Sequence, residues 1–254
     1  HVQILYTAAV VKDELEAAIS TATTLNESLS DSDLAAAITA AQAVYDNASA
    51  SQDDVNEAVE TLNEAVKQAR YAAGLYITNP SFEEGVTVIT KTAAGNEEQP
   101  EGWTVSKTWA GSAWNYAVKV AENATAGDNS YKVRFNWGSD SFSISQVVTA
   151  LPAGNYKLTA DVKNYNANNS VCKATLAAND NATDATTITA QTTLEKSFTL
   201  TEVTDVTITL TTDYTVGSGS SEGILYWDNV TLTAVAEDAV ATAEDYAALA
   251  AALE

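Results

Sequence analysis

The stretch Tyr156-Lys157-Leu158-Thr159-Ala160-Asp161-Val162-Lys163 alternates strictly between apolar and polar residues. Successive side chains of a β-strand point to opposite faces of its sheet, so this stretch predicts a strand with one buried and one polar face. The same alternation occurs at 131–136 and at 206–211. Turn-forming residues separate such stretches at 138–140, 152–155, 179–181 and 217–220. Many strands with one apolar face each predict an antiparallel sandwich of two sheets.

Two short motifs bracket this alternating part of the chain. The first is Asn79-Pro80-Ser81-Phe82-Glu83-Glu84-Gly85, followed by Gly102-Trp103, and the second is Tyr226-Trp227-Asp228-Asn229-Val230. The pattern N-x-x-F-E-x-G, then G-W, then D-N-V resembles the galactose-binding-like jelly rolls of carbohydrate-binding module families 4, 9 and 22. The segment from Gln146 to Tyr156 also resembles a strand-turn-strand unit of these families. The resemblance covers roughly residues 75–235, and it implies a jelly-roll β-sandwich at 75–236.

The part of the chain before the sandwich has a different period. Residues 7–73 contain neither Pro nor Gly, and apolar residues recur there at helical spacing. The apolar positions fall in three groups: Leu15, Ile19, Ala22 and Leu25; Leu34, Ile38, Ala41 and Tyr45; Val55, Val59, Leu62, Val66 and Ala69. Three short-linked helices with one apolar stripe each predict an N-terminal three-helix bundle at 1–74. The fold class expected is therefore multidomain, with an α bundle followed by an all-β jelly roll.

Capping residues and a repeated phrase support the helical prediction. Ser30 or Ser32 is expected to cap the second helix and Ser51 the third, while Gly74 fits the position just past the last helix. Each expected helix contains one copy of a six-residue pattern: an acidic residue, an apolar residue, two variable residues, Ala and a β-branched residue. It is similar to the FIVAR repeat ("found in various architectures") of bacterial surface proteins.

The helical phrase returns at Asp245-Tyr246-Ala247-Ala248-Leu249-Ala250. We expect 237–254 to be a helical fragment that begins a further module of the same polypeptide. The alternative is a helix that folds back on the bundle or the sandwich. Because the chain lacks Met altogether, we also expect it to be an excerpt from, or the mature part of, a longer protein.

Composition excludes several classes of partner. The chain has 34 acidic and 12 basic residues, a formal net charge of −22, which repels nucleic acid and anionic membrane surfaces. No apolar run approaches the roughly 18 residues of a membrane span, so membrane insertion is not expected. The single cysteine, Cys172, excludes an internal disulfide and lies in an alternating stretch, which indicates a buried and inert thiol. The family resemblance implies a secreted or cell-surface bacterial protein.

The sequence offers little support for catalysis. Histidine occurs only as His1, which removes Ser-His, Cys-His and His-metal chemistry, and no phosphate loop or nucleophile elbow is present. Acidic pairs could serve a glycosidase, but the acidic residues lie mainly on expected helix faces and turns. We therefore expect a chain with no catalytic residues, whose parent protein can carry a catalytic domain elsewhere.

The family resemblance implies one metal site. In these families a structural Ca²⁺ often ties the first strand to the last, and Glu83 and Asp228 occupy the matching motif positions. Calcium takes six to eight oxygen ligands, which carboxylates and backbone carbonyls would supply together if the first and last strands pair. The alternative is that Glu83 and Asp228 simply accept hydrogen bonds from backbone amides.

Aromatic residues beside turns are the candidate sugar-binding residues, because the C–H faces of pyranose rings stack on aromatic rings. Those not explained by strand alternation, with a neighbouring amide, are Trp109, Trp114, Tyr116, Trp137, Asn164, Tyr165 and Tyr214. The alternative for each is that it covers its own loop. The polar face of the stretch 157–163 carries no aromatic residue, which favours a loop-end site for a glycan terminus or short oligosaccharide over a long cleft.

The leading hypothesis is therefore a non-catalytic carbohydrate-binding or accessory module of a glycan-handling protein. The rival hypothesis is a structural spacer or adhesin segment without a ligand of its own. Aromatic rings exposed together would favour binding, whereas rings packed inward would favour the spacer.

Overall fold

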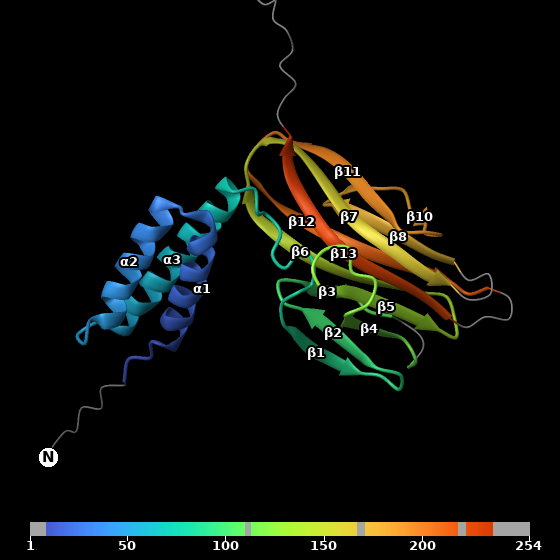
Figure 1. Ribbon diagram of the computed structural model, residues 1–254, viewed down its shortest axis with the longest axis horizontal. Coiled ribbons are helices and arrows are strands. Elements are labelled where there is room, and N and C mark those ends of the chain that lie inside the picture. Colours follow the sequence, from blue (N-terminus) through green and yellow to red (C-terminus); the bar gives the residue numbers. More distant parts are fainter. Residues whose placement is uncertain (1–8, 110–112, 167–170, 218–221, 236–254) are drawn as a thin grey trace, which may run out of the picture. The chain divides into compact units, whose positions relative to one another are not determined.

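The computed structural model describes residues 9–109, 113–166, 171–217 and 222–235 (Figure 1). The chain divides into two compact units, His1–Leu75 and Tyr76–Glu254. The expected helical fragment at 237–254 lies outside the described residues.

The first unit is a three-helix bundle, as the sequence predicted. Within the described residues it consists of α1 (Asp13–Leu29), α2 (Ser32–Asp46) and α3 (Gln52–Ala72). The predicted stripes form its core: Leu15, Ala22, Leu34, Ala41, Val55, Val59, Leu62 and Ala69 are buried. Ile19, Leu25, Ile38, Tyr45 and Val66 pack around them, partly buried. None of the helices in these residues is both long and apolar enough to cross a membrane.

The helix caps follow the sequence at α3 but not at α2. Ser51 caps α3 through a reciprocal capping box with Asp54. The expectation of Ser30 or Ser32 at α2 is wrong, because the N-cap is Asp31, whose carboxylate accepts the Leu34 N–H at 2.8 Å. Ser30 instead ends α1 with a left-handed φ of 54°.

The second unit is a β-sandwich, which confirms the predicted fold. Its described residues form a seven-stranded sheet in the order β1-β2-β4-β5-β13-β7-β11 and a six-stranded sheet containing β10-β8-β12-β6-β3, with β9 beside β8. The first sheet comprises β1 (Val86–Lys91), β2 (Asn96–Pro100), β4 (Tyr116–Val120), β5 (Ser130–Asn136), β13 (Glu222–Val235), β7 (Gly154–Asn166) and β11 (Thr192–Leu200). The second comprises β10 (Thr186–Thr187), β8 (Val171–Ala178), β12 (Thr204–Thr215), β6 (Asp140–Leu151), β3 (Thr104–Lys107) and β9 (Asn181–Ala182).

The alternating stretches supply the core between the sheets. The apolar residues of the three alternating stretches, in β5, β7 and β12, are buried: Tyr131, Val133, Phe135, Tyr156, Leu158, Ala160, Val162, Val206, Ile208 and Leu210. Trp227 of β13 is buried as well and donates its indole N–H to Thr212 Oγ1 of the opposite sheet at 2.8 Å. Cys172 is buried as predicted, and burial raises the pKa of its thiol to about 12, so the thiol is inert at neutral pH.

The first motif anchors the chain entering the sandwich. Phe82 packs against Trp103 and Tyr131, with ring centroids 5.6 and 5.4 Å away. The Trp103 indole N–H donates to the Asn79 carbonyl at 3.1 Å. Buried Gln146 accepts the Thr78 N–H and donates to the Thr78 and Gly102 carbonyls at 2.7, 2.9 and 2.7 Å. The motif residues therefore build the sandwich, as the resemblance implies.

Candidate functional site

One end of the sandwich gathers most of the predicted site residues. β5 and β7 finish there, and β4 and β13 begin there, because Tyr116 pairs with Arg134, Glu222 with Asn136 and Gly223 with Asn166. β12 also finishes at this end and β6 begins there, since Tyr214 pairs with Asp140. Figure 1 shows these strand ends on the right of the view. We call this region the aromatic end.

Three rings of the aromatic end are exposed to solvent. The exposed fraction is 49% for Trp114, 70% for Trp137 and 61% for Tyr165. Isolated exposed apolar residues are common on proteins, but three large aromatic side chains in one region are informative. They are the predicted sugar-binding residues whose side chains are most exposed.

Trp137 is also held in an unusual backbone conformation. Its φ of 66° lies in the left-handed region, which bulky residues rarely occupy. Such a conformation costs on the order of 1–3 kcal/mol, and it is found disproportionately at functional sites. Because the side chain is largely exposed, little burial of the indole offsets this cost, so packing alone does not explain Trp137.

The prediction of Tyr214 as a site residue is wrong. The side chain is only 2% exposed and stacks on Phe135 with ring centroids 5.4 Å apart. Gly223 opposite it makes room, since a Cβ there would lie 2.3 Å from Tyr214 Cε2. Tyr214 thus continues the apolar alternation of β12 as a core residue, although the Gly/Ser residues after it suggested a loop.

Asn164 and Trp109 also pack as structural residues. Asn164 follows Val162 on the inward face of β7, and its amide donates a hydrogen bond to the Ile188 carbonyl. Trp109 is half-buried and stacks on Phe142 at a centroid distance of 4.7 Å. Both hold the sandwich together at this end, which is the alternative that the sequence left open for them.

The outer face of the first sheet adds polar groups that the sequence prediction missed. Tyr116, Arg134, Ile224 and Tyr165 form one cross-strand row over β4, β5, β13 and β7. Arg134 Nε binds Glu222 Oε1 at 2.5 Å, and Arg134 Nη1 donates to the Trp114 carbonyl at 3.3 Å. The guanidinium also lies over the Tyr116 ring, 5.3 Å from its centroid, which covers one face of that ring.

The next row on this face repeats the arrangement. Lys132 lies over the ring of Tyr226 at 5.6 Å and pairs with Glu122 at 3.2 Å. Tyr226 is buried, and its hydroxyl donates to Glu122 Oε2 at 2.9 Å. Burial, followed by the hydrogen bond to Glu122, raises the pKa of the Tyr226 hydroxyl. The sequence pattern indicated only that Lys132 and Arg134 lie on the polar face, because they alternate with core residues of β5, and not which residues lie beside them.

Buried amides fix the two exposed tryptophans relative to this face. Asn115, next to Trp114, accepts the Asn136 N–H at 2.8 Å and donates to Asp140 Oδ2 at 3.2 Å. Asn136 directly precedes Trp137, so one network connects the start of β4 to the β5–β6 turn. Among the described residues, the buried Oδ1 of Asn136 has no hydrogen-bond partner.

The predicted metal residues Glu83 and Asp228 bind one loop, residues 121–129, which we call the clamp loop. Glu83 Oε1 accepts the N–H groups of Asp128 and Asn129, both at 2.8 Å, and Oε2 accepts the Asn129 side-chain amide at 2.6 Å. Asp228 Oδ2 accepts the N–H groups of Thr125 and Ala126 and the Thr125 hydroxyl. Two carboxylates from distant parts of the chain therefore hold the clamp loop.

The donors around these carboxylates do not suit a cation. Calcium needs six to eight oxygen ligands, whereas Glu83 and Asp228 face N–H and O–H groups. The Lys119 ammonium donates hydrogen bonds to the backbone carbonyls of Glu83 and Glu84 at 3.2 and 2.7 Å, so these oxygens already have a partner. In the described part of the chain, no group of three or more His, Cys, Asp or Glu side chains could hold a metal ion. The geometry favours the hydrogen-bonding alternative, and calcium binding stays a prediction.

The strand pairing assumed for that metal site is wrong. β1 lies at an edge of its sheet, with β2, β4 and β5 between it and β13. The residues before β1 make the connection instead, because the Val230 N–H donates to the Pro80 carbonyl at 2.8 Å. Glu83 and Asp228 thus reach the same loop without belonging to paired strands.

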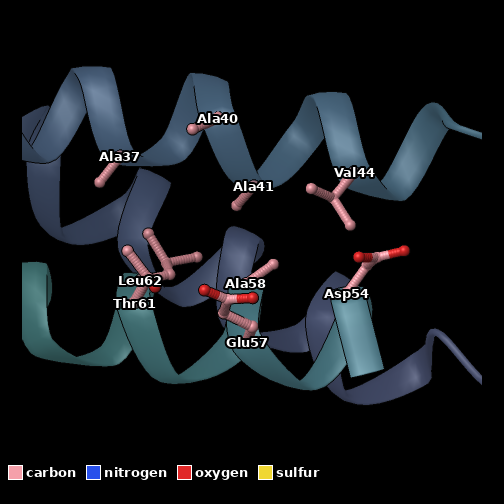
Figure 2. A pocket seen from close by; sticks show the side chains of 9 residues that line it. All are labelled: Ala37, Ala40, Ala41, Val44, Asp54, Glu57, Ala58, Thr61 and Leu62. Atoms are coloured by element: carbon pink, nitrogen blue, oxygen red, sulfur yellow. The ribbon is translucent and has the colours of Figure 1, made fainter. Parts of the chain in front are cut away.

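A separate hollow of about 250 Å³ lies between α2 and α3 of the bundle (Figure 2). Figure 2 shows Ala37, Ala41 and Val44 of α2 pointing toward Ala58 and Leu62 of α3. Asp54 and Glu57 also line it. The hollow results from the small alanine side chains in the stripes, and Asp54 is already engaged in the α3 capping box.

The chain is similar to known proteins only at the level of solved structures. No family model and no curated protein matches the chain. The chain is similar to TmCBM61 in complex with β-1,4-galactotriose, with 18% identity and a TM-score of 0.39 over 63% of this chain and 98% of the other. It is also similar to the CBM22-1 xylan-binding domain of Paenibacillus barcinonensis Xyn10C, with 16% identity and a TM-score of 0.35 over 62% of this chain and 92% of that domain.

A third similar structure belongs to an enzyme. Arabinose-bound MgGH51 α-L-arabinofuranosidase shares 16% identity at a TM-score of 0.39, over 62% of this chain but only 26% of the enzyme. The β-sandwich of the present chain is seen directly in its own strand order, and the candidate site rests on its own residues.

Proposed function

We propose that the β-sandwich binds a carbohydrate, without catalysis, at its aromatic end. The observation that carries this proposal is the joint exposure of Trp114, Trp137 and Tyr165 at that end. Exposed aromatic rings offer the flat apolar faces on which sugar rings stack. The motif resemblance to carbohydrate-binding modules points in the same direction.

Polar groups suited to sugar hydroxyls lie beside the rings. Arg134 offers N–H donors and Glu222 offers carboxylate acceptors on the outer face of the sheet, and Arg134 contacts the carbonyl of Trp114 just before β4. Each stacked ring contributes about 1 kcal/mol beyond the area it buries. We therefore expect a weak site, in the ~mM to ~μM range of Kd, whose avidity increases when several modules act together.

By the same resemblance, we propose that the chain is an accessory part of a secreted or cell-surface bacterial protein that handles glycans, alongside further modules of that polypeptide. The spacer hypothesis is the competing one, because Tyr214 and Trp109 pack into the structure. The two hypotheses differ in what the three exposed rings do.

A glycan array probed with the full chain, followed by calorimetric titration of the strongest glycan, tests the proposal. Trp114→Ala, Trp137→Ala and Tyr165→Ala should each weaken binding about tenfold or more while changing the melting temperature little. Val203→Ala is the matched control, since Val203 is 64% exposed but lies in the β11–β12 turn at the opposite end of the sandwich. An array without any bound glycan would support the spacer hypothesis.

A further inference from the structure

The ion pair of Arg134 and Glu222 lies between the strands that carry Tyr116 and Tyr165. Tyr116 and Tyr165 occupy β4 and β7, and Arg134 and Ile224 lie between them in the same row. With strands about 4.8 Å apart, the backbones of the outer two residues are about 14 Å apart. Glu222 lies one row closer to the aromatic end, opposite Asn136. A sugar stacked on Trp114 or Tyr165 would therefore be brought close to this pair.

The pair is fixed by its surroundings. The Arg134 and Glu222 side chains are 18% and 31% exposed, and their nitrogen and oxygen are 2.5 Å apart. Tyr116 beneath the guanidinium and the Trp114 carbonyl beside it restrict Arg134 further. Pre-ordered donors and acceptors lose little conformational entropy when a ligand binds, so they favour specific recognition.

Both basic residues that β5 places on this face are paired with a carboxylate. Arg134 is paired with Glu222, and Lys132 in the next row is paired with Glu122. The whole chain has a net charge of −22. An anionic sugar such as a uronic acid would have to displace Glu222 from Arg134 and approach a strongly negative protein. A neutral sugar would meet neither cost.

A sugar hydroxyl both donates and accepts, so two adjacent hydroxyls can bind an arginine and a carboxylate at once. We propose that Arg134 and Glu222 determine specificity by binding two adjacent hydroxyls of a neutral sugar, one accepting from the guanidinium and the other donating to the carboxylate. This inference rests on the proposed carbohydrate-binding function. Some sugars lack one of the two hydroxyls or have an N-acetyl or carboxyl group in its place. Such sugars leave Arg134 or Glu222 without a hydrogen-bond partner and are rejected.

Binding by the full chain to neutral, N-acetylated and uronic-acid oligosaccharides on one array tests the inference. The strongest neutral oligosaccharide is then titrated calorimetrically into Glu222→Gln and Arg134→Lys, the second keeping the charge but losing the planar fork. Glu195→Gln is the matched control, because Glu195 pairs with Lys157 at 2.8 Å on β11 and β7 of the same sheet, away from the aromatic end.

We expect both site variants to lose about tenfold or more in affinity and Glu195→Gln to lose less than about twofold. Affinity of the wild type should be nearly unchanged between about 50 and about 500 mM NaCl, because a neutral ligand is not screened. Glycan binding that is indifferent to both variants, or that prefers uronic acids, would overturn this inference and leave the proposed function standing. A chain that binds no glycan would overturn both.

Discussion

Replacing Glu83 with Gln tests what holds the clamp loop. The substitution removes the charge from three hydrogen bonds of 2.8, 2.8 and 2.6 Å, and it places an amide NH₂ against N–H donors of Asp128 or Asn129. Hydrogen bonds to charged groups contribute roughly 1.5–3 kcal/mol each when protected from water. Because Glu83 is exposed, solvent screens these bonds, and we expect a total loss of about 1–2 kcal/mol.

The loss should be visible as a fall of about 2–8 °C in the melting temperature of the sandwich. All five tryptophans, Trp103, Trp109, Trp114, Trp137 and Trp227, lie in the sandwich, so their fluorescence reports its unfolding without a contribution from the bundle. Glu84→Gln is the matched control, since it makes the same charge change one residue away and, among the described residues, the Glu84 side chain accepts no hydrogen bond.

The melts are recorded in EDTA and in calcium chloride. We expect the same loss for Glu83→Gln in both solutions, because N–H groups satisfy the carboxylate. Equal melting of wild type and Glu83→Gln in EDTA would refute this reasoning. A wild-type melting temperature that falls on chelation would show instead that a calcium site is present and contributes to stability.

Three further predictions concern the sandwich. Partial desolvation of the Glu83 carboxylate acts to raise its pKa, but the hydrogen bonds from Asn129 and Asp128 outweigh this effect and lower the pKa. The stabilisation that Glu83 provides should therefore be complete at neutral pH and disappear as the pH falls below about 4. The melting temperatures of wild type and Glu83→Gln should converge at that pH. Gly223→Ala should destabilise the sandwich by about 1–3 kcal/mol in urea denaturation, because its Cβ would lie 2.3 Å from Tyr214; an unchanged midpoint would mean that Tyr214 moves freely. Residues 75–236 should fold without the bundle and keep the wild-type tryptophan emission, whereas aggregation after this truncation would indicate an extensive shared interface.

Periodicity was sufficient to predict most of the fold. The alternation at 156–163 and the helical stripes of 13–72 depend only on which side chains can be buried, and the structure buries them as expected. The α2 cap was misassigned because Asp31 stands between two serines that are equally good capping residues, and only the backbone conformation decides among them.

The candidate site was only partly predictable. Trp114, Trp137 and Tyr165 were identified from their positions beside turns, but Tyr214 has the same sequence context and is buried. The difference lies in Gly223 on β13 of the opposite sheet, which no local pattern near Tyr214 reveals. The Arg134–Glu222 pair was not predicted for a similar reason. Its two residues are 88 positions apart, and only the strand register brings them together.

The most direct test of the central claim is acrylamide quenching of tryptophan fluorescence with and without a saturating glycan from the array. Trp103 and Trp227 are buried, whereas Trp114 and Trp137 are exposed and should dominate quenching in the free protein. If the aromatic end binds the glycan, saturation should strongly reduce quenching in the wild type and have little effect in a Trp114→Ala/Trp137→Ala double variant. A glycan that binds with unchanged quenching would place the site elsewhere and contradict the account.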